Sequence, residues 1–245
     1  MRYFICLLML AFVSNVHAQS PNTFYELRIY QCYPGRLDAL LKRFEQHTTR
    51  LFEKHGMTNV GYWLPTAPDN KSLYYILAYP DQESRNRSWA AFSGDPAWQD
   101  VRTRSEADGK IVEAVTSVFM QPTDLVTPNL AARSADRYFE WRSYTCLPGR
   151  LPALMTRFRD HTLKLFEKHG IENVMYFTTV EAEGVQPKLV YLVAHASEEA
   201  AAKSWADFIV DPQWIAVRDA SEKDGKIIEK LESVYLKPLP FSKWR

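Results

Sequence analysis

An internal repeat constrains the fold of this chain more than any other feature of its sequence. The segment CYPGRLDALLKRFEQHTTRLFEKHG at residues 32–56 returns as CLPGRLPALMTRFRDHTLKLFEKHG at residues 146–170, with 17 of 25 positions identical. The later segments SWAAF, DPAW and SEADGKIVE return after 116 residues instead of 114. A period of this length is too long for a solenoid and is typical of a duplicated domain. We therefore predict two homologous domains, residues 24–125 and 138–241, joined by a linker at residues 126–137.

Each repeat changes between the periodicities of strands and helices. Residues 24–32, 59–64, 73–79 and 110–120 have the composition of strands, whereas residues 37–55 carry apolar side chains at helical spacing and end at Gly56. A second helix, starting near residue 84, is interrupted at Asp95-Pro96 and resumes near residue 98. The order βαββαβ is the ferredoxin-like arrangement.

The inner strands indicate how the two domains pack. LYYILAY and its counterpart LVYLVAH are apolar on both alternating faces, so both faces of each sheet need burial. Two helices cover one face of a four-stranded sheet, and the sheet of the other domain can cover the second face. We predict an α+β fold in which two tandem ferredoxin-like domains pack sheet against sheet within one chain.

The N-terminus has the pattern of a secretory signal peptide. Arg2 supplies a positive charge, residues 4–13 are apolar, and Val16-His17-Ala18 places small residues where a signal peptidase cleaves. We predict a signal peptide at residues 1–18 and export to the periplasm or the extracellular medium, with no membrane contact after cleavage. Cys32 and Cys146 occupy equivalent strand ends, and we expect both to remain unpaired.

Composition and motifs exclude several classes of function. The 30 Lys and Arg residues balance 29 Asp and Glu residues, which argues against binding to nucleic acid. No glycine-rich nucleotide motif, nucleophile elbow or pair of metal-ligating residues at a known spacing occurs, so no cofactor and no metal is indicated. The partners that remain open are a small-molecule ligand and a further copy of the chain.

Several segments together resemble the NIPSNAP family. They are YELRIY, LFEKHG, SWAAF followed by DPAW, DGKIV, and PLPF near the C-terminus, and the resemblance covers nearly all of the chain after the signal peptide, in both repeats. It implies a dimeric α/β barrel, assembled here from the two domains of one chain. It supplies no established reaction and no catalytic residues, so whether the protein is an enzyme stays open.

The leading candidates for a ligand site lie on the first strand of each repeat. Strand alternation places three polar residues on one face, and Tyr25, Leu27 and Ile29 on the other. We expect the apolar face to contact the helices and the polar face to point to the barrel interior or its mouth. There, Arg could hold a carboxylate or enolate, with Tyr as donor and Glu as acid or base. Alternatively, the same groups form an ion pair that keeps the two sheets in register. The six residues are Glu26, Arg28, Tyr30, Glu140, Arg142 and Tyr144.

Histidines of the first helix form a second candidate set. His47 and His161 follow a Phe by three residues, on the expected apolar stripe, and are either ligand-binding residues or buried core histidines. His55 and His169 are better explained as residues at a helix C-terminus. The tryptophans of the second helical region are expected in packing, with a stacking wall for a planar ligand as the alternative.

These observations lead to one functional hypothesis and two alternatives. The hypothesis is an exported protein of the NIPSNAP type that binds a small apolar or aromatic anion in the barrel cavity. The first alternative is a cofactor-free or haem-linked oxygenase or isomerase that uses the same cavity. The second is a module that binds only other proteins. Convergence of Arg28, Tyr30 and His47 on one accessible cavity would favour an enzyme.

Overall fold

The computed structural model describes residues 23–127 and 136–245. The predicted signal peptide, residues 1–18, and most of the predicted linker lie outside the described residues. The first half contains β1 (Phe24–Cys32), α1 (Leu37–Arg43), η1 (Phe44–Thr48), α2 (Thr49–Lys54), β2 (Thr58–Pro65), β3 (Ser72–Tyr79), α3 (Gln82–Gly94), α4 (Pro96–Ser105) and β4 (Val112–Pro122). The second half contains β5 (Tyr138–Cys146), α5 (Leu151–Arg157), η2 (Phe158–Thr162), α6 (Leu163–Lys168), β6 (Glu172–Thr179), β7 (Leu189–His195), α7 (Glu198–Ile209), α8 (Pro212–Ser221) and β8 (Ile228–Pro238).

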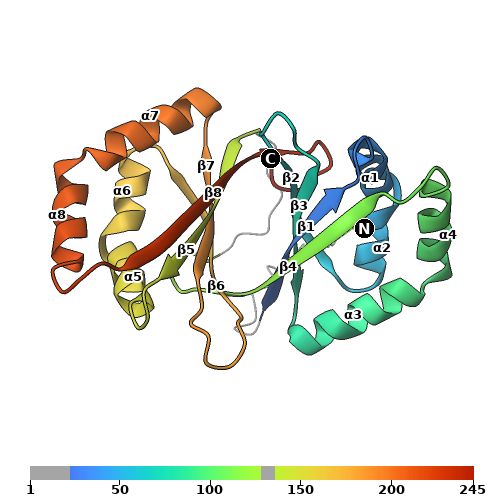
Figure 1. The fold of residues 1–245 in the computed structure, drawn as a ribbon, viewed down its shortest axis with the longest axis horizontal. Coiled ribbons are helices and arrows are strands. Elements are labelled where there is room, and N and C mark those ends of the chain that lie inside the picture. The colour runs from blue at the N-terminus through green and yellow to red at the C-terminus, as the bar shows by residue number, and fades with distance from the viewer. Residues whose placement is uncertain (1–22, 128–135) are drawn as a thin grey trace, which may run out of the picture.

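The strands of the two halves close into one eight-stranded barrel. Its strand order is β1-β3-β2-β8-β5-β7-β6-β4, with antiparallel pairing throughout. The halves join along two seams, where Trp63 of β2 pairs with Pro238 of β8 and Met120 of β4 pairs with Thr179 of β6. The predicted fold, two ferredoxin-like units that form an intramolecular dimeric α/β barrel, is thus confirmed (Figure 1).

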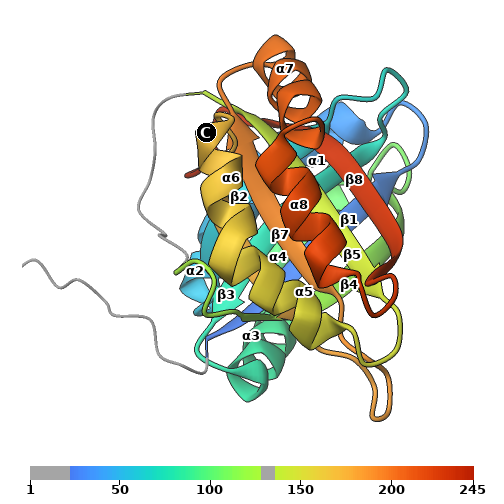
Figure 2. The same ribbon diagram turned by 90° about the vertical axis from the view of Figure 1, so that its left-hand side faces the viewer.

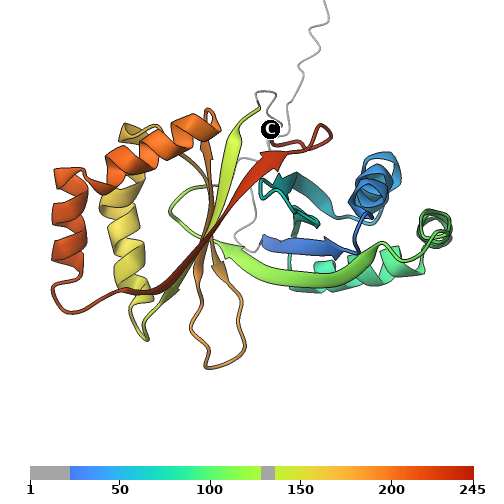
Figure 3. The same ribbon diagram turned by 45° about the horizontal axis from the view of Figure 1, so that its top comes forward.

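Helices cover the outside of the barrel on two opposite sides. In Figure 3 the helices of the first half and those of the second half lie at opposite ends, with the strands between them. Viewed from the side of the second half, α5, α6 and α8 lie across the strands β5 and β7 (Figure 2). No helix among the described residues is long and apolar enough to cross a bilayer.

Local sequence explains where the helices begin and end. The Asp95 side chain accepts a hydrogen bond from the Ala97 N–H, and Pro96 fits the first turn of α4, where no N–H donor is required. After α2 the chain turns through Gly56, which has a φ of 76°, a conformation that glycine adopts without strain. In the second half, Asp211 caps α8 and Gly170 forms the turn after α6.

The first helix of each half contains a π-helical turn. The hydroxyl of Thr48 donates to the carbonyl of Arg43, five residues earlier, at 3.1 Å, and Thr162 repeats this bond with Arg157. Such turns take one more residue than an α-helical turn and occur often at functional sites. This extra residue changes which side chains after Phe44 and Phe158 face the sheet.

Candidate functional site

The barrel interior is an apolar core, and the polar triplets lie outside it. The inner core includes Tyr25 and Leu27, with Ile29 packed against it, so this face of β1 points inward. The expectation that Glu26, Arg28 and Tyr30 point to the barrel interior or its mouth is therefore wrong, and the same holds for Glu140, Arg142 and Tyr144. All six lie between the sheet and the helices of their own half.

The charged groups face outward because the helical layer supplies their partners. The guanidinium carbon of Arg28 lies 4.2 Å from the centre of the Trp89 ring on α3, and that of Arg142 lies 4.3 Å from the Trp205 ring on α7. The inner face offers mainly apolar side chains. A buried charge without partners is costly, so the triplet faces the helical layer, which supplies a tryptophan donor in both halves and an arginine donor in the first.

Glu26 is the centre of the network in the first half. Its side chain is fully buried and accepts hydrogen bonds from Arg28 at 2.7 Å and from Arg85 at 2.8 and 2.9 Å. The Trp89 indole N–H and the Tyr79 hydroxyl also donate to it, at 3.1 and 3.2 Å. Burial raises the pKa of Glu26, but the hydrogen bonds and charges of Arg85 and Arg28 outweigh burial, so the pKa is lowered.

Arg28 connects the carboxylate to hydroxyl groups on neighbouring strands. It donates to the hydroxyls of Tyr75 at 3.0 Å, Ser117 at 3.0 Å and Tyr30 at 3.4 Å. Although desolvation opposes its charge, the surrounding tyrosines and Glu26 raise the pKa of Arg28 further. The guanidinium is therefore a permanent cation held in a fixed orientation.

The second half repeats this arrangement with fewer partners on the carboxylate. Arg142 donates to Glu140 at 2.5 Å, and the Trp205 indole N–H donates to it at 2.6 Å. Arg142 also donates to the hydroxyls of Tyr191 and Tyr144, at 3.0 and 3.1 Å. Burial raises the pKa of Glu140, but His195, Arg142 and Trp205 lower it by more.

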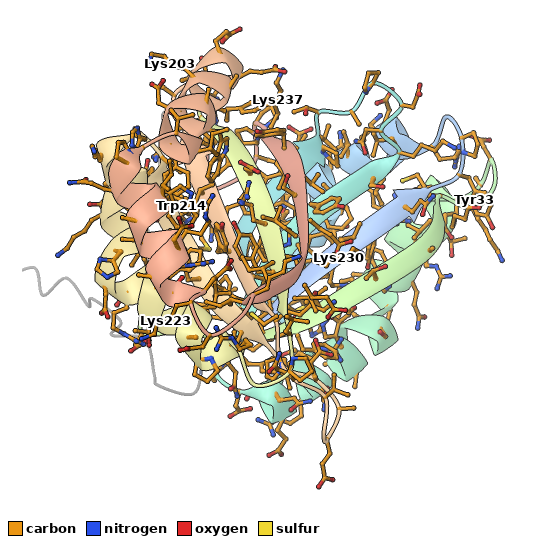
Figure 4. The ribbon with its side chains drawn as sticks, turned by 60° about the vertical axis from the view of Figure 1, so that its left-hand side comes forward. Tyr33, Lys203, Trp214, Lys223, Lys230 and Lys237 are labelled. Carbon is orange, nitrogen blue, oxygen red and sulfur yellow. The ribbon has the colours of Figure 1, made fainter. Side chains whose placement is uncertain are left out.

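A cavity of about 200 Å³ lies between the sheet and the helices of the second half. Arg142 and Tyr144 line it from β5, and Ile209 and Leu231, both partly exposed, belong to the same lining. Trp214, labelled in Figure 4 on α8, lies in the helical layer on this side of the molecule. The rest of its wall is formed by Arg157, Phe158, Thr162, Phe166, Trp205, Phe208 and Ile228.

The first-helix histidines do not join the triplets. His47 and His161 are exposed, whereas the next residues, Thr48 and Thr162, are buried. The expectation that these histidines lie on the apolar stripe is wrong, because the π-helical turn moves the inward position by one residue. They line surface grooves between the first and last helices, of about 260 and 550 Å³. Arg28, Tyr30 and His47 therefore do not meet in one cavity.

His55 and His169 cap the second part of the first helix, as predicted. The Nε2 atom of His55 lies 2.7 Å from a carboxylate oxygen of Asp95, which caps the N-terminus of α4. The Nε2 atom of His169 lies at the same distance from Asp211, which caps α8. Lys54 and Lys168 contact the same carboxylates at 2.6 Å. These hydrogen bonds lower the pKa of both aspartates, and the whole arrangement joins helices.

Two further features of the molecule are relevant to ligand binding. A cavity of about 230 Å³ at one end of the barrel is lined by Trp141 and Ser143 from β5 and by Glu181 and Lys188 beside β6 and β7. Neither Arg28 nor Arg142 lines it. Among the described residues, no group of three or more His, Cys, Asp or Glu is placed to hold a metal ion.

The residues that the sequence interpretation missed come from other strands and helices. Tyr75 and Tyr191 complete the arginine sites, Arg85 binds Glu26, and His195 lies beside Glu140. Two of these residues, Arg85 and His195, stand at positions where the repeats differ in sequence. Arg85 corresponds to Ala201, and His195 corresponds to Tyr79.

Comparison with solved structures shows the same fold in other proteins. A monooxygenase-like protein of Fusobacterium nucleatum has a TM-score of 0.57 at 10% identity, covering 89% of this chain and 93% of that one. An anthrone oxidase-like protein has a TM-score of 0.56 at 10% identity, covering 91% and 94%. A NIPSNAP family protein of unknown function from Agrobacterium tumefaciens is 24% identical over 44% of this chain and 95% of its own, with a TM-score of 0.38.

Sequence comparison assigns the family directly. No curated protein matches the chain. The NIPSNAP family model matches twice, at residues 25–126 and 139–243, and each match covers the four strands and the helices of one half. The chain therefore belongs to the NIPSNAP family, with two copies of the family's domain in tandem.

Proposed function

We propose that the second half binds a small aromatic molecule carrying an anionic or carbonyl oxygen, in the cavity between its sheet and its helices. One observation carries the proposal: a permanent guanidinium and a tyrosine hydroxyl, those of Arg142 and Tyr144, line a cavity whose other walls are mostly apolar and half aromatic. Apolar pockets with a few polar groups in fixed positions are typical of ligand sites. This cavity lies outside the barrel interior, where the sequence alone predicts the ligand.

The chemistry of the walls indicates the ligand class. The Arg142 guanidinium is held by Glu140, Tyr191 and Tyr144, so it does not need to reorganise when an oxygen arrives. Water occupies about 30 Å³ in the liquid, so a cavity of about 200 Å³ has room for one substituted ring. Benzoates and phenols fit this description.

Calorimetric titration with benzoate, salicylate and phenol tests the proposal. We expect one of these probes to bind at one site per chain. Ile209→Trp fills the lining and should abolish binding, whereas Val210→Trp, a change at the neighbouring exposed residue outside the lining, should not. Tyr144→Phe should weaken binding about tenfold, and its counterpart Tyr30→Phe should leave binding unchanged. Absence of binding by the wild type, or equal binding by Ile209→Trp, would refute the site.

An oxygenase activity at this cavity is a second candidate. It is favoured by the two full-length structural neighbours, one monooxygenase-like and one anthrone oxidase-like, which share the fold at TM-scores of 0.57 and 0.56. Oxygen uptake measured with the bound phenol distinguishes the alternatives. Uptake that Ile209→Trp abolishes would establish an enzyme, and binding without uptake or any change in the phenol would establish a binding protein.

We also propose that the protein is exported after cleavage behind Ala18. The support is the positive charge, the apolar run and the small residues of the first 18 positions. N-terminal sequencing of protein from the periplasm or medium should begin at Gln19. A cytoplasmic product that retains Met1 would contradict export.

A further inference from the structure

Arg85 shows how the buried glutamate of the first half binds a guanidinium group. Its Nε and one terminal nitrogen donate to the two oxygens of Glu26, at 2.9 and 2.8 Å, which is a bidentate contact. The guanidinium carbon lies 5.7 Å from the centre of the Trp89 ring and 5.0 Å from that of Phe119. A carboxylate and two aromatic rings thus surround this cation.

The second half keeps the carboxylate and both aromatic positions but has no arginine at this place. Glu140 corresponds to Glu26, Trp205 to Trp89, and Tyr235 to Phe119, whereas Ala201 corresponds to Arg85. Glu140 and Ala201 are buried, and Trp205 still donates to the carboxylate. The second half therefore retains the groups that surround the Arg85 guanidinium in the first half, with alanine in place of that arginine.

A buried histidine provides a second, independent observation. His195 occupies the position of Tyr79, and its side chain is fully buried. Its Nε2 lies 3.7 Å from Oε2 of Glu140, longer than a hydrogen bond, and within the described part of the chain neither ring nitrogen has a hydrogen-bond partner. Buried polar groups without partners are rare and costly, so this ring is placed to contact a further group.

The charge balance of the two halves points to the same conclusion. The first half surrounds one negative carboxylate, Glu26, with two permanent cations, Arg28 and Arg85. In the second half the permanent cation beside Glu140 is Arg142, and the imidazole of His195 lies 3.7 Å from the carboxylate. Glu198, exposed in the first turn of α7 and three residues before Ala201, takes the place of the uncharged Gln82 and adds a negative charge to this helix. One added cation would give the second half the same set of charges around its carboxylate.

We propose that the second half binds a small guanidinium or amidinium cation at Glu140 and His195, in the place that the Arg85 side chain fills in the first half. The planar cation contacts Glu140 and a ring nitrogen of His195, and packs against Trp205 and Tyr235. This site goes beyond the aromatic cavity, since the lining of that cavity includes neither Glu140 nor His195. The two sites therefore have different ligands and different diagnostic variants.

Binding of methylguanidinium, measured by calorimetry at millimolar concentration, tests the proposal. The wild type should bind one equivalent. Ala201→Arg places the protein's own guanidinium on Glu140, as in the first half, and should abolish binding. Ala202→Arg adds the same charge one residue further along α7 at an exposed position and should bind as the wild type does.

Two variants test the site from the other direction. Arg85→Ala together with Tyr79→His gives the first half the residues of the second, so the stoichiometry should rise from one to two. His195→Tyr restores the residue that the first half contains and should weaken binding about tenfold. Because His195→Tyr is a separate variant, the proposal can still be tested if Ala201→Arg does not fold.

The proposal is wrong if methylguanidinium does not bind the wild type, or if Ala201→Arg and His195→Tyr both bind it as the wild type does. Equal loss in Ala201→Arg and Ala202→Arg would show attraction by net charge alone and would also overturn it. Tyr144→Phe is the control that separates this site from the aromatic cavity. It should weaken binding of the aromatic probe and leave methylguanidinium binding unchanged, so a wrong prediction for one site can be distinguished from a wrong prediction for the other.

Discussion

Trp205 donates a 2.6 Å hydrogen bond from its indole nitrogen to Glu140, and its ring covers the guanidinium that neutralises the same carboxylate. Trp89 repeats both contacts with Glu26 and Arg28. One residue of the helical layer thus holds both members of an ion pair on the sheet. The duplicated chain offers a matched comparison of the two networks.

Trp205→Phe should destabilise the protein more than Trp89→Phe, by about 1 kcal/mol. Both changes remove the same indole, but Glu26 keeps one bond from Arg28, two from Arg85 and one from Tyr79, whereas Glu140 keeps Arg142 as its hydrogen-bond donor within the described residues. Urea unfolding of the two variants measures the difference. Equal losses would show that the indole hydrogen bond is not what distinguishes the halves.

The π-helical turns predict which of two adjacent residues contributes more to the free energy of unfolding. His47→Ala should change the free energy of unfolding by less than about 0.5 kcal/mol because the side chain is exposed. Thr48→Val keeps the shape but removes the buried bond to the Arg43 carbonyl, and should cost about 1 kcal/mol. Chemical denaturation of both variants tests this order, and a greater loss in His47→Ala would contradict the π-helical geometry.

The sequence was sufficient to predict the elements and their assembly. The first strand was predicted at residues 24–32, where β1 lies, and the break at Asp95-Pro96 separates α3 from α4. These predictions succeed because strand alternation, helix caps and proline act over a few residues. The packing of the second sheet on the first is predicted because both faces of LYYILAY need burial, and the resemblance to the NIPSNAP family implies the barrel.

The orientation of the triplet and the site around it depend on residues far apart in the chain. Alternation separates Glu26 from Leu27 but does not determine which of them faces the helices. That is decided by Trp89 and Arg85, about 60 positions later, which supply partners for the charge. The sequence predicts the wrong face for His47 because a 3.6-residue period does not reveal a π-helical turn.

Cys32 and Cys146 should react slowly in the folded protein. Both thiols are buried and unpaired, each in the core of its own half, and desolvation raises the pKa of Cys32 and of Cys146 to about 11. Since the thiolate is the reactive form, iodoacetamide at pH 8 should modify both within minutes in urea and neither on that scale in buffer. Rapid labelling of the folded chain would show that these cores open.

Acid should destabilise the protein through its buried glutamates. The folded-state pKa of Glu26 and of Glu140 is lowered from the ordinary value of 4.5, so the unfolded chain takes up protons first as the pH falls. Their contribution is therefore complete above about pH 4.5 and is lost as the pH drops toward the lowered folded-state pKa. Unfolding free energies measured from pH 7 to pH 3 should be level at first and then fall.

Glu26→Gln should lower stability at pH 7, because Arg28 and Arg85 lose their buried counter-charge, and should make the acid decline shallower. Glu45→Gln, a change at an exposed carboxylate, should leave the curve unchanged. An acid decline as steep in Glu26→Gln as in the wild type would assign the pH dependence to other carboxylates, such as the helix-capping Asp95 and Asp211, whose pKa is also lowered by their Lys and His partners.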